Sequence, residues 1–333
     1  MRKTLSIIVG FLLSFLLLYL ALHNISIQMI RVAYSTPTAV QMLVVLAMLV
    51  FMLFVRGWRW SLLVRPCSKA GAYTMFKLEA IGMALNNVLP LRLGEIARAT
   101  IGAGMADAPF LTLLSTIVVE RVLDSITLGI IFAIALQMGG SATLAAYGHW
   151  VLMLVITMAL ALGMLIFLEE MLEHSKMLRD LLAGFPRLDK FARQIAMGAQ
   201  ALRDWKLAIG IIMLGIPLWC TDAFGYYWAA RILNITPAIH YVQGMILLCA
   251  AATSVAMPSM PGYFGPFELA LKTVLVQWGV APDPAVAYAT FVHLNGYIVN
   301  TVVGIIFLYG AGHSLGSIWK HLSSGGKDAQ KAG

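Results

Sequence analysis

The sequence predicts an all-α membrane protein in which six to eight helices cross the bilayer. Of the 333 residues, 60% are hydrophobic and only 11% are charged, which lies outside the range of soluble domains. Long apolar runs recur, and a chain in lipid must satisfy its own backbone hydrogen bonds, as a helix does. Two further apolar stretches are interrupted by Pro and Gly, so we also expect two broken, re-entrant hairpins.

Six apolar runs are long enough for a crossing. They cover residues 5–22, 40–55, 110–136, 150–168, 207–230 and 285–309. The first run follows Arg2 and Lys3, as in a secretory signal. It is long for a signal, and no clear cleavage site follows it, so we expect an uncleaved span.

The two interrupted stretches are residues 72–90 and 241–280. Lys77 precedes the first break and Arg98 follows it, so a hairpin that dips in from the cytoplasmic side fits best. The second stretch fits either two full crossings or a hairpin that enters from the outer face. Its length does not separate these alternatives.

Basic residues are concentrated in alternate links between the spans. The link after the second span holds Arg56, Arg59, Arg65, Lys69 and Lys77, and the longest link, 169–206, holds seven Lys and Arg residues. The links between them are nearly free of charge. By the positive-inside rule, we place both termini in the cytoplasm.

We expect one integral membrane domain, residues 1–312, with a cytoplasmic amphipathic link, 169–206, and a flexible cytoplasmic tail, 313–333. The net charge of +8 does not indicate nucleic acid, because the basic residues are spread over the links. The three cysteines are far apart and indicate neither a disulfide framework nor a metal site. We expect no cofactor and no metal.

The longest link contains a predicted amphipathic helix. Leu188, Phe191 and Ile195 recur at helical spacing, and Asp189 and Arg193 can pair four residues apart on the other face. This pattern indicates a helix on the inner leaflet, either a connector that rests on headgroups or a helix that binds a partner.

Residues 83–100, MALNNVLPLRLGEIARAT, break an apolar run with amides, a proline and charges. Pro removes a backbone donor and Gly weakens a helix, so Pro90 and Gly94 predict an unwound turn between helices over 72–88 and 93–105. At membrane depth, such a turn is tolerated only where protein or water covers the freed backbone. A cavity is therefore expected here.

The second interrupted stretch, SVAMPSMPGYFGPFELAL, has the same character. Its helix-breaking residues are Pro258, Pro261, Gly262, Gly265 and Pro266. In both segments a Pro precedes a Gly by four residues and an acid follows, Glu95 or Glu268, which suits the first turn of a helix. Paired interruptions are typical of transporter sites built by an inverted repeat. Coincidence is the alternative, because Pro, Gly and Glu are common at helix starts.

Glu120, Arg121 and Asp124 lie near the middle of the span over 110–136. A charge at the centre of a helix costs roughly 2.5 to 3.5 kcal/mol, so we expect these three to pair and to face the protein interior. They form either a structural ion cluster or the polar wall of a headgroup site.

Two further polar features lie within spans. Asp222 is expected to face Arg92, Arg98 or Arg121 from another helix, with a role in proton coupling as an alternative. In the last span, Thr290, His293, Tyr297 and Asn300 form a stripe, and Asn295 lies off that face. The stripe is either a hydrogen-bonded seam between helices or part of a site.

The candidate substrate-binding residues are Asn86, Asn87, Arg92, Glu95, Arg98, Glu120, Arg121, Asp124, Asp222, Glu268 and Lys272. A guanidinium can bind phosphate at two points, so Arg92 and Arg98 are the first candidates for an anionic group, with snorkelling to headgroups as the alternative. Lys272, one turn beyond Glu268, either pairs with it or binds phosphate. The sequence contains no HExxH, Walker A or DxD-type motif, so we do not expect an enzyme.

Three stretches together resemble a known family: NNVLPLRLGEIARA, VVERVLDSITLG, and MPGYFGPFELAL with the span that follows. They are similar to the flippase-like membrane family that includes the transmembrane region of lysylphosphatidylglycerol synthase and the hopanoid-associated membrane proteins. The resemblance runs over about residues 5–310. It implies lipid translocation without the synthase's soluble aminoacyl-transfer domain, and it implies that residues 90–98, 120–124 and 261–268 line the lipid route.

The resemblance favours a transporter that moves a polar-headed lipid, of an anionic phospho- or isoprenoid type, between leaflets of a bacterial inner membrane. Arg92, Arg98 and Arg121 would hold the headgroup, and the acids nearby would balance them. Without an ATP-binding motif, movement would be passive or ion-coupled. Two alternatives stay open: a lipid-modifying enzyme that uses Glu95, Glu120 or Asp124 as acid or base, and a non-catalytic subunit that binds envelope-lipid biosynthesis proteins.

Overall fold

A computed structural model describes residues 27–89, 93–138, 148–175, 184–256, 261–316 and 318. All regular elements in these residues are helices, which confirms the predicted all-α class. Within this part of the chain, four helices are long and apolar enough to cross a membrane: α3 (Ala39–Leu63), α8 (Gly148–His174), α11 (Trp205–Ile232) and α14 (Pro282–Gly310). The predicted span over 5–22 lies outside the described residues.

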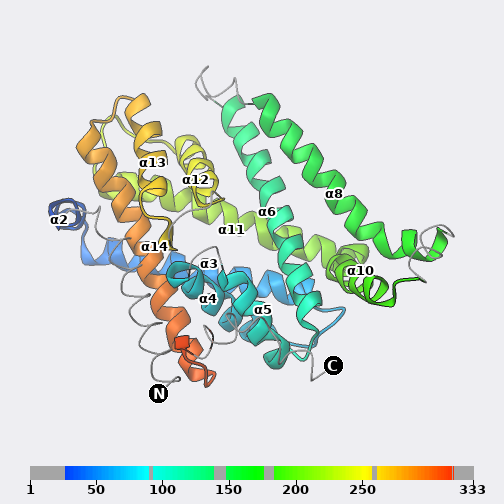
Figure 1. Ribbon diagram of the computed structural model, residues 1–333. Helices are drawn as coiled ribbons and strands as arrows, with labels where there is room; N and C mark the ends of the chain where they lie inside the picture. The colour runs from blue at the N-terminus through cyan, green and yellow to red at the C-terminus, as the bar shows by residue number, and fades with distance from the viewer. Residues whose placement is uncertain are drawn as a thin grey trace.

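One flank of the molecule is formed by α6 (Phe110–Gln137) and α8, which lie side by side and antiparallel (Figure 1). The helix α10 (Pro186–Ala199) packs against both of them, and η2 (Gln200–Arg203) leads from it to α11. The Asp189–Arg193 pair predicted for α10 is present, with 3.0 Å between Arg193 Nε and Asp189 Oδ2. The apolar side chains of α8 are mostly exposed, as expected for a helix that faces lipid.

The helices α4 (Ala72–Val88) and α5 (Leu93–Met105) begin and end where the sequence predicts. Three helices approach α4 closely through glycines, namely Gly57 of α3, Gly94 of α5 and Gly304 of α14. A Cβ added at any of them would lie 2.1 to 2.3 Å from a backbone atom of α4. Because no real Cβ approaches a neighbour so closely, these contacts require glycine.

The second interrupted stretch consists of α12 (Tyr241–Ala256), η3 (Pro261–Tyr263) and α13 (Pro266–Gln277). Gly262 and Gly265 have φ angles of 73° and 94°, and glycine adopts this left-handed region without strain. The helix α13 begins with a proline, as is common at the first helical position. Because η3 contacts α4, the two broken segments meet in the structure.

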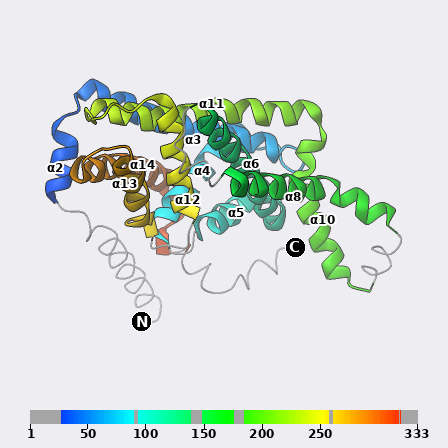
Figure 2. The same ribbon diagram turned by 90° about the horizontal axis from the view of Figure 1, so that it is seen from above.

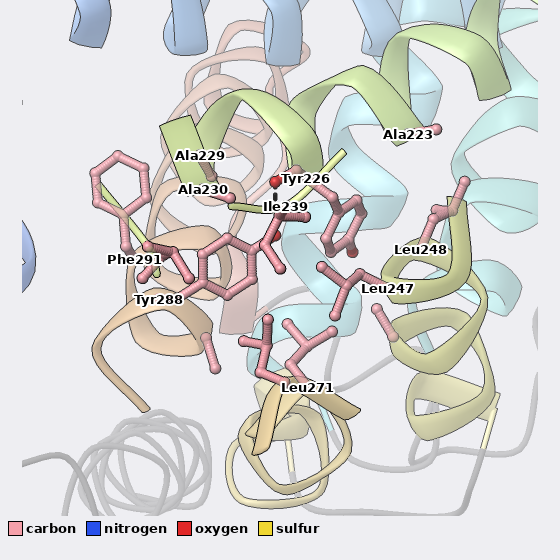
Figure 3. Packing of buried hydrophobic residues seen from close by; sticks show 14 of the residues in the cluster. Ala223, Tyr226, Ala229, Ala230, Ile239, Leu247, Leu248, Leu271, Tyr288 and Phe291 are labelled. Carbon is pink, nitrogen blue, oxygen red and sulfur yellow. Dashed lines mark hydrogen bonds between the residues drawn. The ribbon is translucent and has the colours of Figure 1, made fainter. Parts of the chain in front are cut away.

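Two apolar clusters hold the bundle together. One joins α11, α12, α13 and α14 around Tyr226, Leu247, Leu271 and Tyr288, and the Tyr288 hydroxyl donates to the Tyr226 carbonyl oxygen at 2.7 Å (Figure 3). The other joins α3, α4, α5 and α6 and includes Trp60. The helices α3 and α11 lie side by side along one edge (Figure 2), and α2 (Ile27–Ser35) packs on α14.

Candidate functional site

A single ion-pair network joins α3, α4, α5, α6 and α11. Among the described residues it contains four arginines and five carboxylates: Arg56, Arg59, Arg98, Arg121, Glu79, Glu95, Glu120, Asp124 and Asp222. Its members differ in burial. One part is sealed inside the helix packing, and the other part faces a cavity.

Arg98 is at the centre of the sealed part, with only 2% of its side chain exposed. Its guanidinium pairs with Glu79, and it lies 3.0 Å from a carboxylate oxygen of Glu95 and of Glu120. It also stacks on Trp60, 4.5 Å from the ring centroid. The expected role of Arg98 in holding a headgroup therefore needs correction, because three carboxylates and an aromatic ring already occupy its surroundings.

Arg59 is the second sealed arginine. Its Nη2 lies 2.6 Å from Asp124 Oδ1 and 3.3 Å from Glu120 Oε1. Sequence analysis assigned Arg56 and Arg59 to a cytoplasmic link, and this was wrong, because α3 continues past both of them. The acids of α6 supply the opposite charges that allow a helix to continue through two buried arginines.

A cavity of about 430 Å³ lies beside the network. Its charged wall consists of Arg56, Glu95, Arg121, Asp124 and Asp222. Apolar side chains of α3, α6 and α12 form another wall, among them Val45, Leu128 and Val255. Asn86 and Asn87 at the end of α4 also line the cavity, while residues 90–92 of the expected turn lie outside the described residues.

The two arginines of the cavity wall are more exposed than the sealed pair. Arg56 lies 4.0 Å from both Asp124 and Asp222. Arg121 keeps 31% of its side chain exposed, lies 2.9 Å from Glu120 and 3.6 Å from Asp124, and has an Nε without a hydrogen-bond partner among the described residues. The predicted Arg121–Asp124 pair is confirmed. The partner expected for Asp222 was wrong, because Asp222 faces Arg56.

The amides and the broken turns have distinct roles. Asn87 Nδ2 donates to the Tyr297 carbonyl oxygen at 3.2 Å and to Thr301 Oγ1 at 2.9 Å, which ties α4 to α14. Asn86 Nδ2 reaches Glu95 Oε1 at 3.5 Å, while its Oδ1 lacks a partner among the described residues. Both amides therefore help to position the end of α4. Three candidate residues, Pro90, Arg92 and Pro258, fall outside the described residues.

The stripe on α14 belongs to the cavity wall. His293, Tyr297 and Asn300 line it, and so does Asn295, which the sequence analysis placed off that face. Thr290 is buried. Three of the four predicted stripe residues therefore border the cavity, and the fourth is buried in the helix packing.

Glu268 and Lys272 on α13 differ in their surroundings. Glu268 Oε1 lies 2.5 Å from Nδ1 of His293, and Glu268 Oε2 accepts the Gly265 N–H at 2.7 Å. Lys272 has no ion pair with any described residue and does not line the cavity. The expected pair between Lys272 and Glu268 is therefore absent from the described residues, and its expected contact with phosphate stays a prediction.

Sequence analysis missed Arg56, Arg59 and Glu79 as members of the network. The signal for Glu79 was present, since an acid inside an apolar stretch indicates a buried partner. For Arg56 and Arg59, the signal was the continuation of apolar residues and Trp60 at helical spacing beyond them.

The fold and the site define a multi-pass, all-helical membrane protein with a buried ion-pair network beside a cavity. The family described as the lysylphosphatidylglycerol synthase TM region matches residues 7–304. The chain therefore belongs to this family, as its sequence motifs indicated. No curated protein and no solved structure matches the chain.

Proposed function

We propose that this protein moves a polar-headed lipid between the leaflets of a bacterial inner membrane. The observation that carries the proposal is that one cavity combines a charged wall with an apolar wall. A lipid needs both environments, because its headgroup must keep polar partners while its acyl chains avoid water. Membership of a membrane family named for a lipid-synthesising enzyme supports the same class of substrate.

Arg56 and Arg121 are the residues best placed to hold an anionic headgroup. Both line the cavity: Arg56 lies 4.0 Å from Asp124 and Asp222, and Arg121 pairs with Glu120 at 2.9 Å but keeps 31% of its side chain exposed and an Nε without a partner among the described residues. A hydrogen bond to a charged group is worth about 1.5 to 3 kcal/mol, and a guanidinium can make two. Asp124 and Asp222 would then keep the empty site neutralised between transport events.

The broken segments supply the route in this proposal. The pairs α4–α5 and α12–α13 would be re-entrant hairpins, and the contact between η3 and α4 supports their meeting at the site. Both termini would be cytoplasmic, because the basic links are concentrated on one side. Movement would be passive or coupled to an ion, since the sequence holds no ATP-binding motif.

The test is the rate at which a fluorescent phosphatidylglycerol changes leaflet in proteoliposomes. We expect the protein to accelerate exchange, and Arg121→Gln to slow it by about tenfold, which corresponds to one lost charged contact of about 1.4 kcal/mol. Arg231→Gln, at the exposed end of α11, is the matched control and should leave the rate unchanged. An exchange rate that does not change when the protein is added contradicts the proposal.

Mass spectrometry of the same lipids separates transport from chemistry. A transporter leaves their masses unchanged, whereas the alternative of a lipid-modifying enzyme requires covalently altered lipid. Covalently altered phosphatidylglycerol that depends on Glu95 or Asp124 would replace the transport proposal.

A further inference from the structure

The pair formed by Glu268 and His293 borders the same cavity but is separate from the arginine network. Glu268 Oε1 and His293 Nδ1 are 2.5 Å apart, and His293 lines the cavity. A proton must lie between the two atoms, because two lone pairs at this distance would repel each other. The pair therefore holds either one proton, with one net negative charge, or two protons, with no net charge.

The surroundings of the imidazole suit a second proton. The rings of Phe264 and Phe267 each lie 4.3 Å from the His293 ring, at interplanar angles of 32° and 29°. Two rings this close and this nearly parallel cannot share one face, so they cover both faces of the imidazole. The π faces of aromatic rings are negative and attract a cation. A positive charge on this ring would therefore lie between two negative π faces and beside the Glu268 carboxylate.

The charge of the neighbouring network explains why this proton matters to the substrate. Four arginines face five carboxylates among the described residues, so the network carries one net negative charge before Glu268 is counted. An anionic headgroup that enters the cavity meets this negative charge. A second proton on the pair removes one negative charge at the cavity wall. Proton and anion therefore favour each other's binding, and this coupling is reciprocal.

We propose that Glu268 and His293 form a proton-binding site, and that the proton taken up there accompanies an anionic headgroup into the cavity. The inference rests on the proposed function and adds the identity of the coupling ion. The proton passes from cavity water to the pair, which becomes an imidazolium hydrogen-bonded to a carboxylate. Because Glu268 also accepts the Gly265 N–H at 2.7 Å, the same carboxylate holds the turn that precedes α13.

Other charged and titratable groups surround this pair. Those that line the cavity or lie on α13, α14 and the elements packed against them are Arg31, Tyr34, Arg56, Arg59, Tyr73, Lys77, Glu79, Glu95, Arg121, Asp124, Lys206, Cys220, Asp222, Tyr226, Tyr227, Arg231, Tyr241, Cys249, Tyr263, Lys272, Asp283, Tyr288, Tyr297 and Tyr309. Asp222 is the rival proton acceptor, because it is an acid of the cavity wall with a partner as distant as 4.0 Å. The experiment must separate these two sites.

The experiment measures proton uptake as a headgroup binds. Purified protein in weakly buffered detergent is titrated with dioctanoyl-phosphatidylglycerol at several pH values between about 5 and 8. Calorimetry reports the amount bound, and a pH indicator reports the protons taken up. We expect the wild-type protein to take up as much as one proton for each headgroup bound, with affinity increasing as the pH falls.

Variants then assign the proton to its site. We expect His293→Gln and Glu268→Gln to abolish the uptake, and His240→Gln, at an exposed histidine just before α12, to retain it. Thermal unfolding of each variant shows whether it is folded, and the wild-type uptake tests the proposal without any substitution. Binding without proton uptake overturns the inference and leaves the proposed function standing. Uptake that survives in both variants, or that is lost only in Asp222→Asn, also overturns it. Absence of binding contradicts the proposed function as well.

Discussion

Arg59 and Arg56 lie one turn apart on α3, but they occupy different environments. Arg59 is sealed, with 2% of its side chain exposed and 2.6 Å to Asp124, whereas Arg56 lines a cavity and stays 4.0 Å from each of two acids. Two arginines on one helix therefore have different physical roles. A sealed charge holds helices together through its ion pairs. A charge at a cavity wall can also bind a ligand that enters the cavity.

The largest expected effect is the loss of a sealed arginine. Arg59→Gln leaves Glu120 and Asp124 short of positive charge in a buried site, so we expect a loss of about 3 to 5 kcal/mol in the free energy of unfolding. Arg56→Gln should cost less, about 1 to 3 kcal/mol, because its pairs are 4.0 Å long and Asp222 keeps 22% of its side chain exposed. Tryptophan fluorescence during unfolding in detergent measures both. Equal losses would show that the two environments do not differ.

The second-largest loss of stability is expected where helices pack closely around the sealed part of the ion-pair network. Gly94→Ala places a Cβ 2.2 Å from the Gly82 carbonyl oxygen, so we expect a loss of about 1 to 3 kcal/mol from overpacking. Gly104→Ala on the same helix meets nothing within 4 Å, and it should be neutral or stabilise α5 by about 0.5 to 1 kcal/mol. Tryptophan fluorescence during unfolding measures both variants. If Gly94→Ala leaves the free energy of unfolding unchanged, α4 and α5 separate easily.

A milder change at the cavity wall tests geometry apart from charge. Arg121→Lys keeps the positive charge but loses the planar fork that binds phosphate at two points. We expect lipid exchange in proteoliposomes to slow by about threefold to tenfold, and stability to change by less than about 1 kcal/mol. A wild-type rate in this variant would argue that the headgroup is not held by paired hydrogen bonds.

The smallest effect is expected at Lys272, which belongs to neither environment. Lys272→Gln removes a charge without an ion pair among the described residues, so stability should stay within about 0.5 kcal/mol of the wild type. The exchange rate should stay the same within experimental error. A marked loss of lipid exchange would place a second anion contact near α13.

The ends of several helices could be predicted from residues that act on their own backbone. Pro90 and Gly94 predicted the ends of α4 and α5, because proline and glycine act on the backbone where they stand. The acids in the first turns of α5 and α13, Glu95 and Glu268, were also predicted, since helix starts favour negative charge.

The pairing between helices could not be predicted in the same way. Asp222 was expected to face Arg92, Arg98 or Arg121, but it faces Arg56. Nothing in the sequence indicates which helix packs against which, so the partner could not be chosen. Arg56 and Arg59 resemble charges at the end of a span until the acids of α6 are known to face them. Sequence analysis therefore identified most charged residues of the site but not which of them a ligand can reach.

The glycine contacts around α4 decide which part of the protein is free to rearrange. Because α3, α5 and α14 touch the backbone of α4 directly, α4 cannot rotate or slide without first separating from all three. For the proposed transport, we therefore expect the moving elements to be η3 and α13, with α4 stationary. Glycines usually weaken a helix, but Gly57, Gly94 and Gly304 hold α4 in place by allowing its neighbours to approach it closely.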